Sequence, residues 1–262
     1  MIPKLALVLV VLVLAFGTER MAQSLVTILT NCLLFLAIII GIYFGCPPSL
    51  TASLGCFAIF LNSLFYSGGI NEKTISAFYS VLIVMGITAA LSWVFIWYGN
   101  LQGFMVRQYV NISAAEGYTD HIRVNMLWLT IAVVLITMLG TAIDTSVTIA
   151  SSMYEVRRHS PDLSEADLRR SGISVGKDIV SSSMHTLFFI FFAEYMTLFI
   201  YFAEFSQFSE AVNSKEVVQQ IVIIAVAGIA SALVIPVTSS ISAHRFAKLK
   251  PEDFIEANVT NK

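Results

Sequence analysis

Long apolar runs constrain this chain more than any other feature, because a helix needs about 20 predominantly apolar residues to cross a lipid bilayer. Charged residues make up only 12% of the 262 residues, whereas a soluble domain carries about 25%. This small number of charges cannot cover a water-exposed surface. We therefore predict an all-α integral membrane protein that is a polytopic bundle of transmembrane helices. About seven runs could serve as spans, namely 2–16, 25–44, 50–66, 75–98, 126–153, 179–202 and 217–241.

The polar segments between these runs are short, and none could hold a separate soluble domain. We therefore predict one transmembrane domain over residues 1–250, with a charged cytoplasmic loop at 154–178 and a cytoplasmic tail at 251–262.

Basic residues indicate the orientation, because cytoplasmic loops carry an excess of Lys and Arg. With seven spans and the N-terminus outside, the inside segments hold Arg20, Lys73, Arg157, Arg158, Arg169, Arg170, Lys177, Arg245, Lys248, Lys250 and Lys262. The outside segments then hold only Lys4, Arg107, Arg123 and Lys215. This excess favours an outside N-terminus and an inside C-terminus. The alternative, a cleaved signal peptide over the first run, would place the Arg-rich loop outside.

The sequence gives no support to several other classes of protein. The 15 Lys and Arg residues form no basic cluster outside one loop, so we expect no nucleic-acid partner. Cys32, Cys46 and Cys56 form no CxxC motif, and we expect them to be small buried hydrophobic residues. We expect no metal or cofactor, because no ligand spacing such as HxxxE supports one. We also expect no enzyme, since an intramembrane aspartyl protease needs two facing Asp residues and only Asp144 lies deep.

One polar stripe interrupts the fifth run. Thr137, Thr141, Asp144, Thr148, Ser151 and Glu155 follow one another by steps of four and three, which puts them on one face of a helix. An Asp at mid-membrane costs about 2.5–3.5 kcal/mol and normally faces a bundle interior or a water-filled path. The stripe predicts a proton relay in which Asp144 is the protonated group. Alternatively, Asp144 hydrogen-bonds to Ser and Thr on neighbouring helices and holds them together.

The sixth run supplies candidate partners for this stripe. Asp178, Ser182 and His185 share one helical face, and His exchanges protons near neutral pH. Glu194 lies nine residues beyond His185, nearly on the opposite side of the helix. The other interpretation of His185 is a hydrogen-bonded packing residue.

The charged loop predicts a short cytoplasmic helix. Ser160 or Asp162 could cap its start, Arg169 and Arg170 match the dipole at its end, and Gly172 would terminate it. The helix is either a solvated connector or a surface that contacts a partner protein through Arg169 and Arg170.

The second and third runs are expected to form a hairpin, because Pro47-Pro48 makes a tight connection. Asn31 and Asn62 are expected to hydrogen-bond across the two runs.

Two segments carry a family resemblance. "LGTAIDTSVTIASSMYEV" followed by "LRRSGISVGKDIVSSSMHTLFF" resembles the YibE/F family of multi-spanning bacterial membrane proteins, over nearly the whole chain. His185 stands where the family pattern would have an Asn. The resemblance implies a multi-pass protein of the bacterial cytoplasmic membrane. It also implies partners, namely the lipid bilayer and either further copies of the chain or a related membrane chain.

A looser resemblance concerns mechanism. The intramembrane Asp followed by an acidic residue at the cytoplasmic end looks like the Asp-bearing helix of SecD/SecF and other resistance–nodulation–division transporters. Only Asp144 corresponds to the intramembrane Asp of those proteins, with Glu155 as the acid at the helix end. The large extracytoplasmic domain of those proteins is missing. This resemblance implies a proton-coupled transporter or permease-like subunit. The alternative is a non-transporting membrane scaffold that recruits a partner through the cytoplasmic loop.

Overall fold

The computed structural model describes residues 4, 7–8, 11, 19–66, 68–101, 125–205 and 213–249. The helices within these ranges are α2 (Glu19–Tyr43), α3 (Pro48–Leu61), the π-helix η1 (Asn62–Tyr66), α4 (Glu72–Tyr98), α6 (Met126–His159), α7 (Glu165–Phe205) and α9 (Lys215–Phe246). No strand occurs among the described residues, so the all-α prediction is confirmed.

Five of these helices contain stretches that are long and apolar enough to cross a membrane: Ala22–Tyr43, Glu72–Tyr98, Met126–His159, Glu165–Thr197 and Val217–Phe246. The third predicted run, at Leu50–Tyr66, is an apolar helix shorter than these. The first predicted run, 2–16, lies almost entirely outside the described residues. The helices therefore make this a multi-pass membrane protein, while a total of seven spans stays a prediction.

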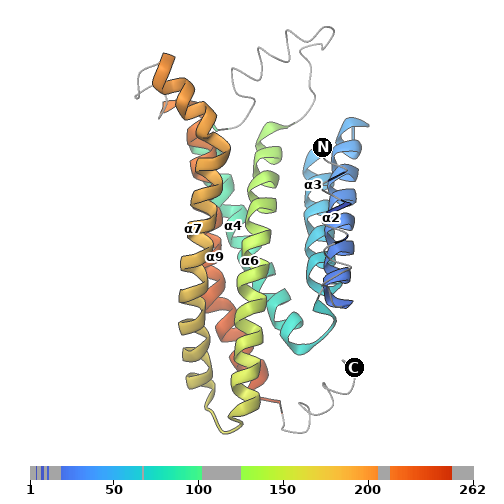
Figure 1. Ribbon diagram of the computed structural model, residues 1–262, viewed down its shortest axis with the longest axis vertical. Helices are drawn as coiled ribbons and strands as arrows, with labels where there is room; N and C mark the ends of the chain where they lie inside the picture. The colour runs from blue at the N-terminus through green and yellow to red at the C-terminus, as the bar shows by residue number, and fades with distance from the viewer. Residues whose placement is uncertain are drawn as a thin grey trace.

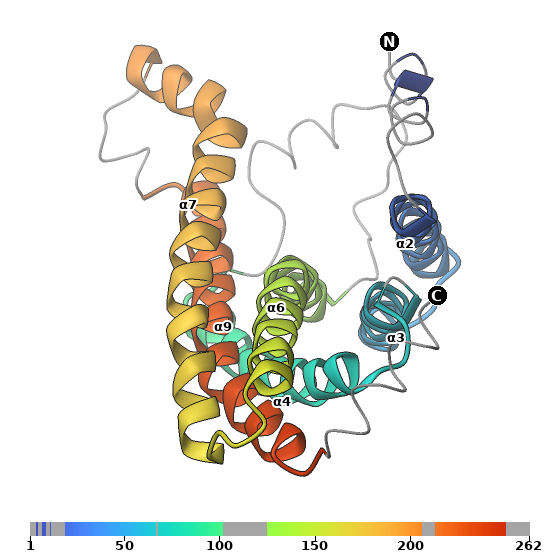
Figure 2. The ribbon, with the colours of Figure 1, turned by 60° about the horizontal axis from the view of Figure 1, so that its bottom comes forward.

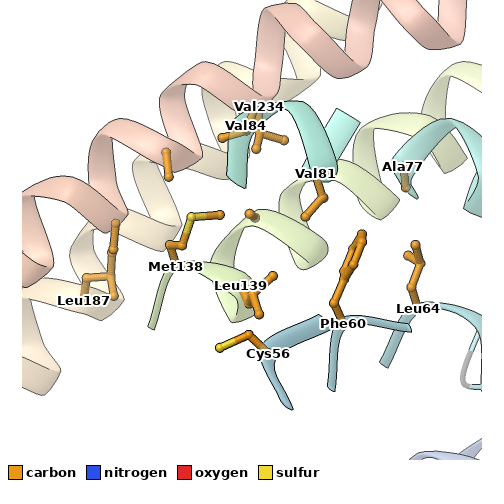
Figure 3. Packing of buried hydrophobic residues seen from close by; sticks show 13 residues of the cluster. Cys56, Phe60, Leu64, Ala77, Val81, Val84, Met138, Leu139, Leu187 and Val234 are labelled. Carbon is orange, nitrogen blue, oxygen red and sulfur yellow. The ribbon is translucent and has the colours of Figure 1, made fainter. Parts of the chain in front are cut away.

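The helices form one main bundle with a hairpin at its side. α4, α6 and α9 pack against one another, and α7 packs on α9 and α6 (Figures 1 and 2). The hairpin of α2 and α3 lies beside this bundle and reaches α6 through α3. The central core contains Val81, Met138 and Val234, and Phe60 and Leu64 join it from the side of the hairpin (Figure 3).

The α2–α3 hairpin is held together by polar contacts as well as by packing. Asn62 Nδ2 donates to Asn31 Oδ1 at 2.8 Å, and Asn31 Nδ2 donates to Ser63 Oγ at 2.8 Å. Pro48 opens α3, directly after the turn. The predicted hairpin and its Asn–Asn bond are confirmed. Such bonds matter in a membrane because lipid provides no hydrophobic force between helices.

The start of α7 differs from the prediction. Neither Ser160 nor Asp162 caps it, because the helix begins only at Glu165. Ser164 is the capping residue, and its Oγ accepts the backbone N–H of Asp167 at 3.2 Å and donates to the Asp167 carboxylate at 2.6 Å. A Ser three residues before an acidic side chain is typical of a helix start, and here the Ser164 hydroxyl satisfies the free backbone N–H of Asp167.

The prediction that a helix ends at Gly172 is wrong, since α7 continues without a break to Phe205. Gly172 is instead a packing residue. A Cβ there would come within 2.4 Å of Met153 Sδ, and one at Gly176 would come within 2.5 Å of Ile235 Cγ2. The two glycines, four residues apart, let α7 approach α6 and α9 closely.

Only one of the three cysteines is buried as expected. Cys56 lies in the core, whereas Cys32 and Cys46 are exposed. Cys32 lies on α2, which packs only on α3 and η1 among the principal helix contacts, and Cys46 lies in the turn after α2. A small hydrophobic side chain on a lipid-facing surface has no need of burial within the protein.

We predict that Gly176→Ala destabilises the bundle by about 1–3 kcal/mol, the usual cost of overpacking. Its new methyl group would meet Ile235 and Ile149. Gly86→Ala in α4 is the matched control, because a Cβ there meets nothing within 4 Å. Thermal unfolding in detergent measures both. Equal melting temperatures for the two variants would contradict the close approach of α7.

Candidate functional site

The polar stripe lies on the outward face of α6. Gly140, Asp144 and Thr148 are exposed. Thr137, Thr141, Ser151 and Glu155 are half-buried at its edges. Asp144 therefore does not face the interior of this bundle, where an intramembrane acid is commonly found.

Packing on the opposite side explains this orientation of α6. Val134, Met138, Ala142, Ile149 and Met153 are fully buried and form the face that meets the rest of the bundle. These residues interdigitate with α4, α7 and α9. Turning α6 to bury the stripe would replace these apolar contacts with an unpaired acid.

The carboxylate of Asp144 forms no hydrogen bond or ion pair with any residue that the structure describes. The hydroxyl groups around it bond to their own helix. Thr148 donates to the Asp144 carbonyl at 2.7 Å, Thr141 to the Met138 carbonyl at 3.0 Å, and Thr137 to the Val133 carbonyl at 2.9 Å. Each hydroxyl oxygen keeps its acceptor capacity. The stripe can thus accept hydrogen bonds from water or from a protonated Asp144.

The surface around Asp144 differs from the other exposed faces. Exposed side chains of α7 include Phe188, Phe189 and Phe192, as suits contact with lipid chains. On α6, which is described throughout, Trp128 and Val133 are the exposed large hydrophobic residues. From Gly140 to the end of the helix, every fully exposed residue is small or polar.

The candidate partners on the sixth run lie on the surface of α7. Asp178, Ser182, His185 and Glu194 are all exposed. No hydrogen bond or ion pair joins any of them to Asp144 within the described ranges. The structure therefore does not assemble them with the stripe into one site.

Arg169 and Arg170 are exposed near the start of α7. Arg170 Nη1 lies 3.6 Å from Asp167 Oδ1, one turn earlier on the same helix. Both guanidinium groups remain accessible to a partner.

Sequence reasoning missed the ion pairs that hold one end of the bundle together. Glu155 Oε1 accepts from Lys73 Nζ at 3.2 Å, which joins α6 to α4. Arg158 lies 3.6 Å from the other Glu155 oxygen. Lys73 also sits 4.4 Å from the centre of the Tyr154 ring. Glu155, expected to be the end of a relay, thus also links two helices.

A second pair joins α4 to α9 at the same end. Arg245 Nη2 and Nε donate to Glu72 Oε2 at 2.7 Å and 3.1 Å. Asn71 caps α4, and its side chain accepts the Thr74 N–H at 3.0 Å. Glu72 lies at the start of α4 and Arg245 at the end of α9, where an acid and a cation suit the helix dipoles. This placement of charges at helix ends can be seen in the sequence. We call Glu72, Lys73, Glu155, Arg158 and Arg245 the ion-paired end.

We predict a coupling free energy of about 0.2–1 kcal/mol between Lys73 and Glu155, the range for partly exposed pairs. A double-mutant cycle of Lys73→Met and Glu155→Gln, followed by chemical unfolding, measures it. Asp167 and Arg170 provide the control, because that pair is more exposed and lies within one helix. A coupling no larger than that of the control would contradict a role in joining α4 to α6.

Comparison with known proteins identifies a family. Residues 5–248 match the sequence model of the YibE/F-like protein family, and this range includes every described helix. No curated protein and no solved structure matches the chain significantly. The looser resemblance to SecD/SecF and the resistance–nodulation–division transporters is not shown by these comparisons. Because the family match spans far more than half of the sequence, the chain belongs to the YibE/F-like family.

Proposed function

We propose that the chain is a transporter or permease-like subunit in which Asp144 takes up and releases a proton. One observation carries the proposal: Asp144 is exposed midway along a helix long enough to cross the membrane, with no described partner for its carboxylate. Exposure of an acid to lipid at that depth costs about 2.5–3.5 kcal/mol. Water or another protein chain must therefore cover this face in the working assembly.

The stripe offers a route between Asp144 and one end of the bundle. Thr148 and Ser151 lie between Asp144 and Glu155, on the same face of α6. Eleven residues separate the two acids, about 16 Å along a helix axis. In the proposal, protons move along these hydroxyl groups with intervening water, on the outside of this bundle.

The distribution of charge supports a cytoplasmic location for the ion-paired end. Lys73, Arg157, Arg158 and Arg245 gather where α4 begins and α6 and α9 end, toward the bottom of Figure 1. Described residues at the opposite end include Lys215, at the start of α9. Cytoplasmic segments are rich in Lys and Arg, so the proposal keeps the C-terminus inside and the protein in the bacterial cytoplasmic membrane.

The proposal includes a second membrane chain, either a copy of this one or a related protein. Gly140, Thr141 and Thr148 are small residues on the outward face, and small residues allow helices to approach closely in lipid. A neighbouring chain would shield the stripe from lipid while leaving room for water. No enzymatic step is part of the proposal.

We predict that Asp144→Asn inserts and folds normally but abolishes proton-driven transport. The amide preserves shape and polarity but cannot carry the proton. Proteoliposomes on a solid-supported membrane, challenged with pools of solutes under a pH gradient, report the transport current. Asp162→Asn is the control, since Asp162 is exposed in the turn before α7. Full currents in the Asp144→Asn protein would contradict the proposal.

A non-transporting scaffold is the second candidate, favoured by the accessible Arg169 and Arg170 near the start of α7. It predicts that Arg169→Glu with Arg170→Glu abolishes capture of a partner from solubilised membranes, while Asp144→Asn leaves capture intact. Quantitative mass spectrometry of affinity-purified samples measures both. Unchanged capture by the double Arg variant would count against the scaffold.

A further inference from the structure

A second polar group lies inside the bundle and is separate from the outward stripe. It consists of hydroxyl side chains from three helices, within about three turns of the ion-paired end. We call it the hydroxyl layer: Ser76 and Ser80 of α4, Thr145 and Ser146 of α6, and Thr238, Ser239 and Ser242 of α9. Each of these residues has a relative exposure of 0%, so the layer is sealed from lipid.

One side chain joins the three helices of the layer. Ser146 Oγ lies 3.0 Å from Thr238 Oγ1 of α9 and 3.4 Å from the Ala77 carbonyl oxygen of α4. These contacts join α6 to both α4 and α9 at this level. Polar groups of all three helices therefore meet at Ser146.

The contacts between α4 and α9 place two further hydroxyl groups at a similar depth in the bundle. Glu72 pairs with Arg245 at the surface. Further in, Ala77 and Thr238 both contact Ser146. Ser76 and Ser242 belong to the stretches of α4 and α9 between these two levels. They therefore lie just beneath the ion pairs.

Four hydroxyl groups of the layer lack a partner. The oxygens of Ser76, Thr145, Ser239 and Ser242 are buried and form no hydrogen bond with any described residue. Ser80 shows the usual alternative, since it donates to the Ser76 carbonyl at 2.7 Å. Leaving a buried hydroxyl unsatisfied costs about 1–3 kcal/mol, and buried polar groups in native proteins are nearly always bonded. A ligand that this chain does not supply would remove the penalty.

The chemical groups of the hydroxyl layer favour water as the ligand. Its groups are neutral hydroxyls and a backbone carbonyl, and a buried water typically makes two to four hydrogen bonds to such groups. A cation is disfavoured, because the adjacent ion-paired end combines two carboxylates, Glu72 and Glu155, with three cations, Lys73, Arg158 and Arg245. We infer that the hydroxyl layer is a binding site for ordered water inside the bundle. This site is distinct from the transport path proposed on α6.

Two buried methionines allow an experimental test for this water. A Cβ added to Gly172 would lie 2.4 Å from Met153 Sδ and 2.8 Å from Ser239 Oγ. Met153 therefore borders the hydroxyl layer. Met138 is equally buried but lies in the apolar core (Figure 3). The hydroxyl beside Met138, that of Thr88, already donates to a backbone carbonyl.

X-ray pulses generate hydroxyl radicals from bound water in place, and these oxidise adjacent methionine. Applied to the full chain in lipid nanodiscs, with peptide mass spectrometry, the pulses should oxidise Met153 several-fold faster than Met138. Equal protection of the two residues would overturn the inference. This comparison requires no variant.

A variant then connects the water to the hydroxyl groups. Ser239→Ala with Ser242→Ala should lower the oxidation rate of Met153 to that of Met138 without raising the melting temperature. A dry layer would instead give an unchanged rate and a higher melting temperature, because two unsatisfied groups are removed, and that result would overturn the inference. Ser92→Ala is the control, since Ser92 is buried but bonded to the Thr88 carbonyl at 2.7 Å. It should leave the Met153 rate unchanged.

Discussion

The packing of α6 against α4, α7 and α9 is the constraint on which the other polar features depend. Met138 and Ala142 on one side of α6 meet α4 and α9 in the core. This contact fixes the rotation of α6 about its axis. Asp144 is consequently exposed, and Ser146, two residues later, is fully buried. Two polar systems on opposite sides of one helix follow from a single packing arrangement.

The two systems meet at the ion-paired end. Glu155 ends the outward stripe and also holds Lys73 of α4. Glu72 and Arg245 cover the hydroxyl layer from the surface. Opening of these pairs would uncover the hydroxyl layer at the end of the bundle where the stripe also ends.

Much of the fold could be predicted from the sequence, but the direction of the polar stripe could not. Apolar length and turn residues identified the five long helices and the Asn31–Asn62 contact. Helical spacing assigned Asp144 to a polar face, yet periodicity is the same whether that face points inward or outward. The ion pairs were missed because Glu72 and Arg245 lie 173 residues apart. Gly172 was misjudged because the same residue that ends many helices also permits close packing.

In the proposed function, the outward stripe of α6 contacts water rather than lipid. Spin labels on cysteines at positions 137, 141, 144 and 148 test it in reconstituted membranes, through relaxation by a water-soluble nickel complex and by oxygen. A label at Phe189, an exposed residue of α7, gives the lipid reference. The account predicts that the nickel complex relaxes the stripe labels far more than the reference label. Oxygen-dominated relaxation of the stripe, equal to that at Phe189, would contradict it.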